Sequence, residues 1–189
     1  MITKQLIVYL LACMGLLACS ASSVTIEGKD GINRQKEYYL YGCQAGSLIP
    51  IASALIDSNG CFRLNVPLPQ EGFYLLGTEQ GVMHPFYLKG NETIRLRFQT
   101  NGMILEGEQT PENQALSQWE QAATLVREHA FLYERFGGGY STDPATFTQE
   151  LEDLLRVRQQ LKPEKATGNA TFNSLLKAKM EADVDFYAL

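Results

Sequence analysis

The chain has 189 residues and a formal net charge of −5 at pH 7, and 45% of its residues are hydrophobic, a composition typical of globular proteins. Its 16 basic residues form no cluster, so the sequence lacks the positive surface expected of a nucleic-acid-binding protein. The length allows one sizeable core or two small ones, and no internal repeat indicates a solenoid.

The first nineteen residues have the pattern of a bacterial lipoprotein signal. Lys4 precedes an apolar run over 6–17, which closes on Leu16-Leu17-Ala18-Cys19. The run is too short for a membrane-spanning helix, which needs about 20 apolar residues. It resembles a lipobox, which implies that residues 1–18 are a signal peptide and that Cys19 is the lipid-attachment site. Residues 19–23 are then expected to form a short lipidated tether.

This segment offers two alternatives to cleavage before Cys19. The same tetrapeptide also ends at Cys13, but cleavage there would leave an apolar region shorter than the roughly 7 residues that a signal needs. An ordinary secretory signal, cut near Ala18 or Ala21, is the alternative. No acidic run follows Cys19, which favours the periplasmic side. We therefore expect a cell-envelope protein that is lipid-anchored to a membrane and faces the periplasm.

Residues 24–108 are predicted to form an antiparallel β-sandwich of about eight strands. Short alternating runs occupy 24–27, 38–41, 49–57, 61–66, 73–78, 82–88, 93–98 and 103–106. Turn residues separate them, and Asn59-Gly60 is typical of a hairpin because both residues adopt positive φ at low cost. Eight short strands at this spacing are typical of a sandwich or a barrel.

Residues 109–189 are predicted to form three helices, so the fold class is α+β. Thr110-Pro111 and Asp143-Pro144 both have the pattern of a helix start, in which a capping side chain precedes proline. The first helix is expected to end at Gly137 and the second before Pro163. The third begins near 169–171, and its apolar stripe continues to Leu189. An unpaired stripe there would suit a connector to a further domain.

Two cysteines, Cys43 and Cys61, remain in the predicted folded part. If 38–43, 48–57 and 61–66 form a meander, these cysteines lie about 25–30 Å apart, given a rise of about 3.3 Å per residue. A disulfide needs Cα atoms within about 7 Å. Free thiols are therefore expected, with a disulfide as the alternative. The sequence contains no Cys-X-X-Cys, the dithiol of redox catalysts.

No other pattern indicates catalysis, so we expect no catalytic, cofactor-binding or metal-binding residue in this chain. The two histidines, His84 and His129, lack the spacing of a metal or catalytic motif and are expected to be structural or solvated. An aromatic set is the one candidate binding surface, with cross-strand packing as the alternative. It comprises Tyr38, Tyr39, Tyr41, Phe73, Tyr74, Phe86 and Tyr87.

A family resemblance extends over residues 24–115. It is carried by Tyr38-Tyr39-Leu40-Tyr41, the stretch 54–64 around Asn59-Gly60, Gly72-Phe73-Tyr74-Leu75-Leu76, Pro85-Phe86-Tyr87-Leu88, and Leu105-Glu106-Gly107 followed by Glu112-Asn113. Together these motifs resemble the N-terminal β-sandwich domain of unknown function that precedes thioredoxin-like domains in TlpA/ResA-type envelope lipoproteins. The thioredoxin-like domain with its Cys-X-X-Cys is absent from this sequence, so no catalytic residue is carried over.

The resemblance implies a non-catalytic accessory role in a thiol–disulfide oxidoreductase system, with a thioredoxin-like domain or a partner protein supplying the redox chemistry. The alternative is a stand-alone lipoprotein that binds a glycan or a peptide, and a third possibility is an enzyme. A solvent-facing patch at Tyr39 and Tyr41 would favour binding. An unpaired apolar surface on the last helix would favour a partner domain.

Overall fold

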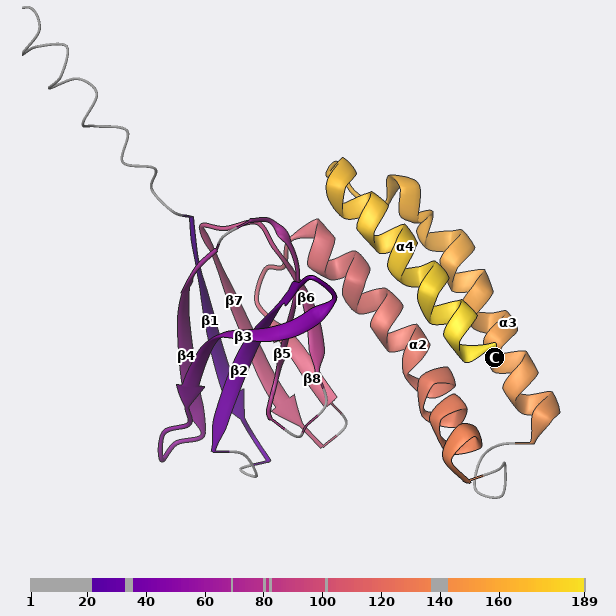
Figure 1. The fold of residues 1–189 in the computed structure, drawn as a ribbon, viewed down its shortest axis with the longest axis horizontal. Coiled ribbons are helices and arrows are strands. Elements are labelled where there is room, and N and C mark those ends of the chain that lie inside the picture. Colours follow the sequence, from indigo (N-terminus) through magenta and orange to yellow (C-terminus); the bar gives the residue numbers. More distant parts are fainter. Residues whose placement is uncertain are drawn as a thin grey trace, which may run out of the picture.

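The computed structural model describes residues 22–32, 36–68, 70–79, 81, 83–100, 102–136 and 143–188. The predicted signal peptide, Cys19, Gly137 and Leu189 lie outside these residues. The described chain is α+β, with the strands gathered on one side and the helices on the other (Figure 1). Its strands are β1 (Ser23–Asp30), β2 (Glu37–Gln44), β3 (Ser47–Leu55), β4 (Cys61–Pro67), β5 (Gly72–Gly77), β6 (His84–Leu88), β7 (Glu92–Gln99) and β8 (Gly102–Glu106). Its helices are α2 (Pro111–Phe136), α3 (Pro144–Leu161) and α4 (Ala170–Tyr187), with a 3-10 turn, η2 (Pro163–Lys165), between the last two.

The eight strands form two four-stranded sheets, ordered β4-β1-β7-β8 and β3-β2-β5-β6. Pairing is antiparallel except between β1 and β7, which run parallel with Ile26 opposite Ile94. The expectation of purely antiparallel strands is therefore wrong at this one pair. The physical reason is that no hairpin joins β1 to β7, since the intervening chain visits the other sheet and returns.

The meander considered for 38–66 does not form. β2 and β3 pair in one sheet, whereas β4 pairs with β1 in the other. The turn at Asn59-Gly60 exists, and the carboxylate of Asp57 accepts the N–H groups of Asn59 and Cys61 at 2.8 Å each. This turn therefore carries the chain from one sheet to the other instead of closing a hairpin.

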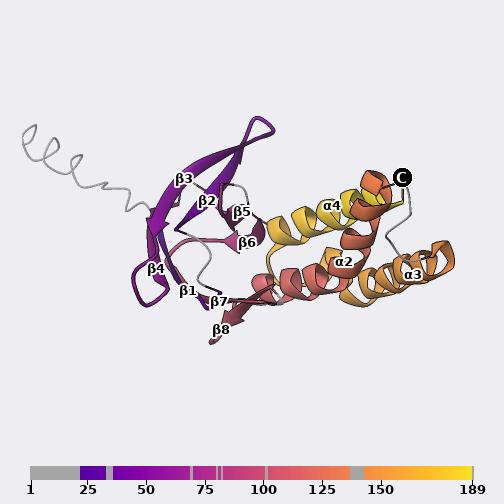
Figure 2. The ribbon, with the colours of Figure 1, turned by 90° about the horizontal axis from the view of Figure 1, so that it is seen from below.

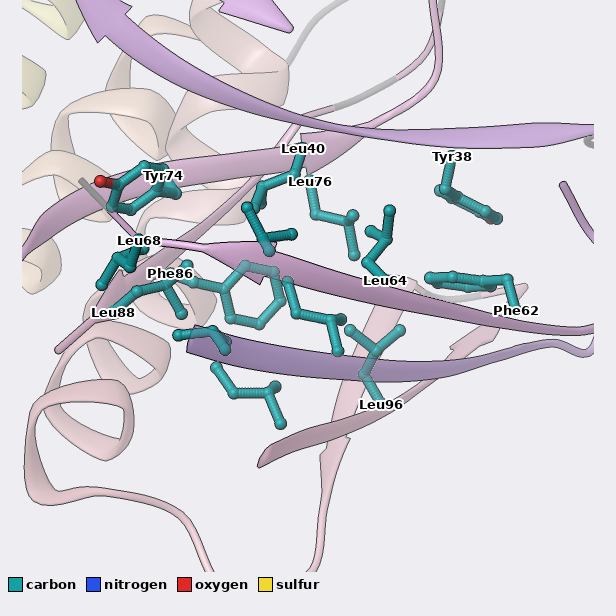
Figure 3. Close-up of a cluster of buried hydrophobic side chains, with 14 of the residues drawn as sticks. Tyr38, Leu40, Phe62, Leu64, Leu68, Tyr74, Leu76, Phe86, Leu88 and Leu96 are labelled. Atoms are coloured by element: carbon teal, nitrogen blue, oxygen red, sulfur yellow. The ribbon is translucent and has the colours of Figure 1, made fainter. Parts of the chain in front are cut away.

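A single buried cluster draws side chains from both sheets (Figure 3). The ring of Tyr38 on β2 stacks against Phe62 on β4 and Phe98 on β7, with centroids 4.5 Å apart in both pairs. A Cβ at Gly28 would lie 2.1 Å from the Phe62 ring, so only glycine leaves room for this stack. Alternation along the strands places these residues on the inner face, and their neighbours point outward.

The predicted helix starts are confirmed. Thr110 Oγ1 accepts the N–H of Asn113 at 3.2 Å ahead of α2, and Asp143 caps α3 by accepting the N–H groups of residues 145 and 146. Asn169 caps α4 in the same way, through the N–H of Phe172. Helix α3 ends at Leu161, and Pro163 opens the following 3-10 turn.

The helices share a second buried cluster, centred on Trp119 of α2. The ring of Phe172 on α4 contacts Tyr87 of β6, with centroids 4.9 Å apart, and Phe73 of β5, at 6.1 Å. Tyr87 belongs to this second cluster, whereas its neighbour Phe86 belongs to the first. The helices therefore pack on the outer face of sheet β3-β2-β5-β6.

Candidate functional site

A groove with a volume of about 440 Å³ lies between that outer sheet face and helices α2 and α4. Its sheet side is apolar and includes Tyr41, Leu75 and Pro85. These three residues are directly opposite one another on β2, β5 and β6, so they form one row across the sheet. Leu40 and Leu76, next to them in sequence, point into the core between the sheets. Because alternate side chains of a strand point to opposite faces, the same strands supply both the wall of the groove and the core.

The helix side of the groove carries Glu120, Arg127 and Lys179. Arg127 Nη2 lies 2.7 Å from Glu120 Oε2, and Lys179 Nζ lies 2.9 Å from Glu120 Oε1. Lys179 Nζ also lies 2.8 Å from Asp183 Oδ2, which accepts the indole N–H of Trp119 at 2.7 Å. We call Glu120, Arg127, Lys179 and Asp183 the α2–α4 ion network; its two cations and two anions balance.

The two cations of the network stay charged in the folded protein. Burial disfavours the ammonium form of Lys179, but the carboxylates of Glu120 and Asp183 outweigh burial and raise its pKa. Burial likewise acts against the guanidinium of Arg127, while a hydrogen bond to the Tyr187 hydroxyl and the charge of Glu120 raise its pKa. Arg127 Nε donates to that hydroxyl at 3.0 Å. Both cations therefore persist at neutral pH.

A second hollow, of about 850 Å³, opens beside the first between the strand ends and α2. Both hollows are lined by Met83, Pro85, Glu120 and Arg127, so they meet at the ion network. The second hollow also contains His84, whose pKa is lowered by burial and by Arg127, against an opposing effect of Glu120. The two hollows therefore adjoin each other on the side of α2 that faces the strands.

The sequence-derived candidates fall in several places. Cys19 lies outside the described residues. Cys43 is exposed at the rim of the groove and Cys61 is half-buried on β4; both are free thiols, as expected, on strands of different sheets. His129 Nδ1 lies 2.7 Å from Glu150 Oε2 between α2 and α3, a structural contact. Within the described ranges, no three His, Cys, Asp or Glu side chains gather in a way that could hold a metal ion.

The aromatic set divides into core and surface. Its buried members, which confirm the packing interpretation, are Tyr38, Tyr74, Phe86 and Tyr87. The partly exposed members are Tyr39, Tyr41 and Phe73. The rings of Tyr39 and Tyr41 lie 6.0 Å apart on the outer face of β2, and Tyr41 and Phe73 line the groove. Three members of the aromatic set are therefore partly exposed on the outer face of β2 and β5.

Exposed apolar side chains concentrate on the edge strand β3, which pairs only with β2. Leu48, Ile49, Ile51 and Leu55 are exposed by 38% to 73%. The β2–β3 hairpin that carries them projects from the body (Figure 2). On α4, Phe172, Leu176 and Met180 are buried, whereas Phe186 is 61% exposed. The apolar stripe of α4 is thus mostly packed within the helix cluster, so the expected unpaired surface on the last helix is reduced to Phe186 and the partly exposed Leu175.

Sequence analysis missed the charged side of the groove. Glu120 and Arg127 are seven residues apart on α2, which is two helical turns and places both on one face. That spacing was the available signal. Their partner Lys179 comes from α4, and no local pattern shows which face of α4 packs against α2.

A scan against models of known protein families finds no match, and no curated protein matches this chain. None of the described helices is long and apolar enough to cross a membrane.

Proposed function

We propose that this chain is a lipid-anchored protein of the cell envelope, attached through Cys19 and facing the periplasm. Its body is a non-catalytic accessory module of a thiol–disulfide oxidoreductase system. Residues 24–108 form a β-sandwich of the type found before thioredoxin-like domains, and residues 109–189 pack on one of its faces. The role of the module is to hold or orient a thioredoxin-like domain that carries the redox dithiol.

The exposed apolar side chains of β3 are the observation that carries this proposal. Strand β3 has no charged residue over Ser47–Leu55, and four of its large apolar side chains contact water. Exposed apolar surface marks interaction sites on soluble proteins. Leu48 lies near the turn of the projecting hairpin and also lines the groove, so a domain docked on β3 would reach both surfaces.

The shared core supports the sandwich part of the proposal. Side chains from β2, β5 and β6 meet those from β1, β4 and β7 in one buried cluster, as the inner faces of a sandwich do. The parallel β1–β7 pair is compatible with this arrangement. It affects only the direction of strands within one sheet, and the two sheets still pack face to face.

A photo-activated cross-linker at Ile49, in the native protein in membranes, tests the docking role. The same cross-linker at Ile104, exposed on the edge strand β8 of the other sheet, is the matched control. We expect Ile49 alone to cross-link to a protein segment that contains a thioredoxin-like Cys-X-X-Cys. Products of any other kind, or equal products at Ile104, would contradict the proposal.

Lipid attachment is tested by metabolic labelling with an alkyne fatty acid and by intact-mass measurement of the detergent-extracted protein. We expect label in the native chain and in Cys13→Ala, and loss of label in Cys19→Ala. Label that survives in Cys19→Ala would show that the anchor is elsewhere or absent.

The groove favours a second candidate function, a lipoprotein that captures a ligand on its own. Its volume of about 440 Å³ falls within the range of roughly 300–1,000 Å³ typical of ligand sites. An apolar aromatic wall faced by a few convergent charged groups is the usual composition of such sites. The test is equilibrium binding of defined ligands to the purified protein.

A further inference from the structure

We propose that the groove binds the C-terminal end of an extended apolar peptide, with the terminal carboxylate held by Arg127 and Lys179. This inference rests on the second proposed function and deepens it by naming a ligand class. It does not depend on docking at β3.

The polar end of the groove has hydrogen-bond donors to spare. A guanidinium has five N–H donors. Those of Arg127 that are engaged go to Tyr187 and Glu120. An ammonium has three donors, and Lys179 directs its contacts to Glu120 and Asp183. Both groups retain N–H donors, which suit an acceptor-rich, negatively charged group in the groove that they line.

Glu120 is not available to bind a cationic ligand, because both of its carboxylate oxygens already contact cations. Oε2 is bound to Arg127 and Oε1 lies 2.9 Å from Lys179. A carboxylate entering beside Glu120 would share these two cations, and hydrogen bonds between charged groups are the stronger class. The N–H donors that Arg127 and Lys179 retain are therefore what favours a carboxylate at this position.

The opposite wall selects an apolar chain. Tyr41, Leu75 and Pro85 form a row across three strands, and Phe73 and Leu48 extend it. A glycan would leave its hydroxyl groups without partners along this wall, at a cost in desolvation. Alternating side chains of an extended peptide would instead bury apolar area against it.

The second hollow offers room for an extended ligand. It continues from the ion network along α2, past Ser117 and Gln121, and its volume is about 850 Å³. Because both hollows are lined by Arg127, a peptide whose terminus lies there has room to extend away from it in either direction.

The first test compares the tripeptide Leu-Ala-Phe with its C-terminal amide by isothermal titration calorimetry on the purified, detergent-solubilised protein. We expect the acid to bind about tenfold or more tightly than the amide, because the amide lacks the charge that strengthens hydrogen bonds to Arg127 and Lys179. The chain's one tryptophan, Trp119, bonds to Asp183 of the same network. Its fluorescence is therefore expected to change on binding of the acid.

A matched pair of variants locates the site. Leu175 lines the groove and is 37% exposed on α4, whereas Leu125 is 49% exposed on α2 and does not line it. Leu175→Asp places a like charge beside the carboxylate and is expected to weaken binding about tenfold or more. Leu125→Asp is expected to bind as the native protein does. Because both positions are surface-exposed, both variants should fold.

The outcomes test separately the carboxylate contact, the peptide as ligand, and the groove as a ligand site. Equal affinity for acid and amide would overturn the carboxylate contact while leaving peptide capture in place. Octanoate binding as tightly as the tripeptide would overturn the peptide as ligand. No binding of any probe, or equal loss in Leu175→Asp and Leu125→Asp, would overturn the groove as a ligand site and the second proposed function with it.

Discussion

At the scale of single residues, Asn113 joins the two parts of the molecule. Its side chain lies in the first turn of α2 and bonds the backbone of Tyr87 twice: Oδ1 accepts the N–H, and Nδ2 donates to the carbonyl, both at 2.9 Å. Strand β6 is an edge strand, so Asn113 supplies the partner that a neighbouring strand would otherwise provide.

Replacing Asn113 with alanine should leave two buried backbone groups of Tyr87 without partners. We expect Asn113→Ala to lower the free energy of unfolding by about 3 kcal/mol, measured by urea denaturation. Gln114→Ala is the control, because its hydrogen bond to the carbonyl of Gln109 is exposed and its loss should cost within about 0.5 kcal/mol. Equal losses in the two variants would contradict this role.

His84 makes stability depend on pH. Burial lowers its pKa from the ordinary 6.5, the nearby Arg127 adds to this, and Glu120 opposes it. The unfolded chain therefore takes up this proton at a higher pH than the folded chain does. Stability should fall as pH decreases below about 6.5, since protons then favour the unfolded state. His84→Gln should make the urea midpoint depend less on pH. If the pH dependence of the variant equals that of the native protein, groups other than His84 cause it.

At the scale of elements, the β2–β3 hairpin carries an unfavourable turn residue. Ala45 has φ 51° and Gly46 has φ 80°, and the left-handed region suits glycine or asparagine. We expect Ala45→Asn to stabilise the protein by about 0.5 kcal/mol and Ala45→Val to destabilise it by about 1 kcal/mol. Urea denaturation measures both, and amide exchange in β2 and β3 shows whether the change is local. Changes of the same sign would contradict the turn assignment.

Most elements could be predicted because their signals are local. Asp143 and Asn169 indicate helix starts, because their side chains cap the first backbone N–H groups. Alternation along 61–66 and 93–98 indicates strands that are buried on one face. Sheet membership could not be predicted in this way. The Asp57-to-Cys61 turn is equally able to close a hairpin or to carry the chain to another sheet. Distant contacts, such as Phe62 on Tyr38, decide between the two.

At the scale of the whole molecule, Phe172 joins the helices to the outer face of one sheet. The core between the sheets and the core of the helices are separate groups of side chains, and Phe172 binds the helices to the sheet through Tyr87 and Phe73. The groove and the ion network exist because of this attachment. Sequence analysis predicted both parts but not their orientation, because the periodicity of α4 does not identify the ring that receives Phe172.

Phe172→Ala should therefore weaken both parts at once. We expect a loss of about 3–5 kcal/mol in the free energy of unfolding, typical of a buried phenylalanine replaced by alanine. Hydrogen exchange should become faster in α4 than in β1 or β7. Phe186→Ala, on the same helix but largely exposed, should cost within about 0.5 kcal/mol. A large loss in Phe186→Ala would indicate that this surface is covered.

The position of β1 determines how the molecule responds to force. β1 lies inside its sheet, with β4 on one side and β7 on the other, and it is paired from Val24 to Lys29 on both. A pull on the chain ahead of Ser23 runs along the axis of this strand, so the ladder bonds on both flanks are loaded together in shear instead of opening one after another. The end of the chain predicted to carry the lipid thus enters the sheet at a mechanically strong point.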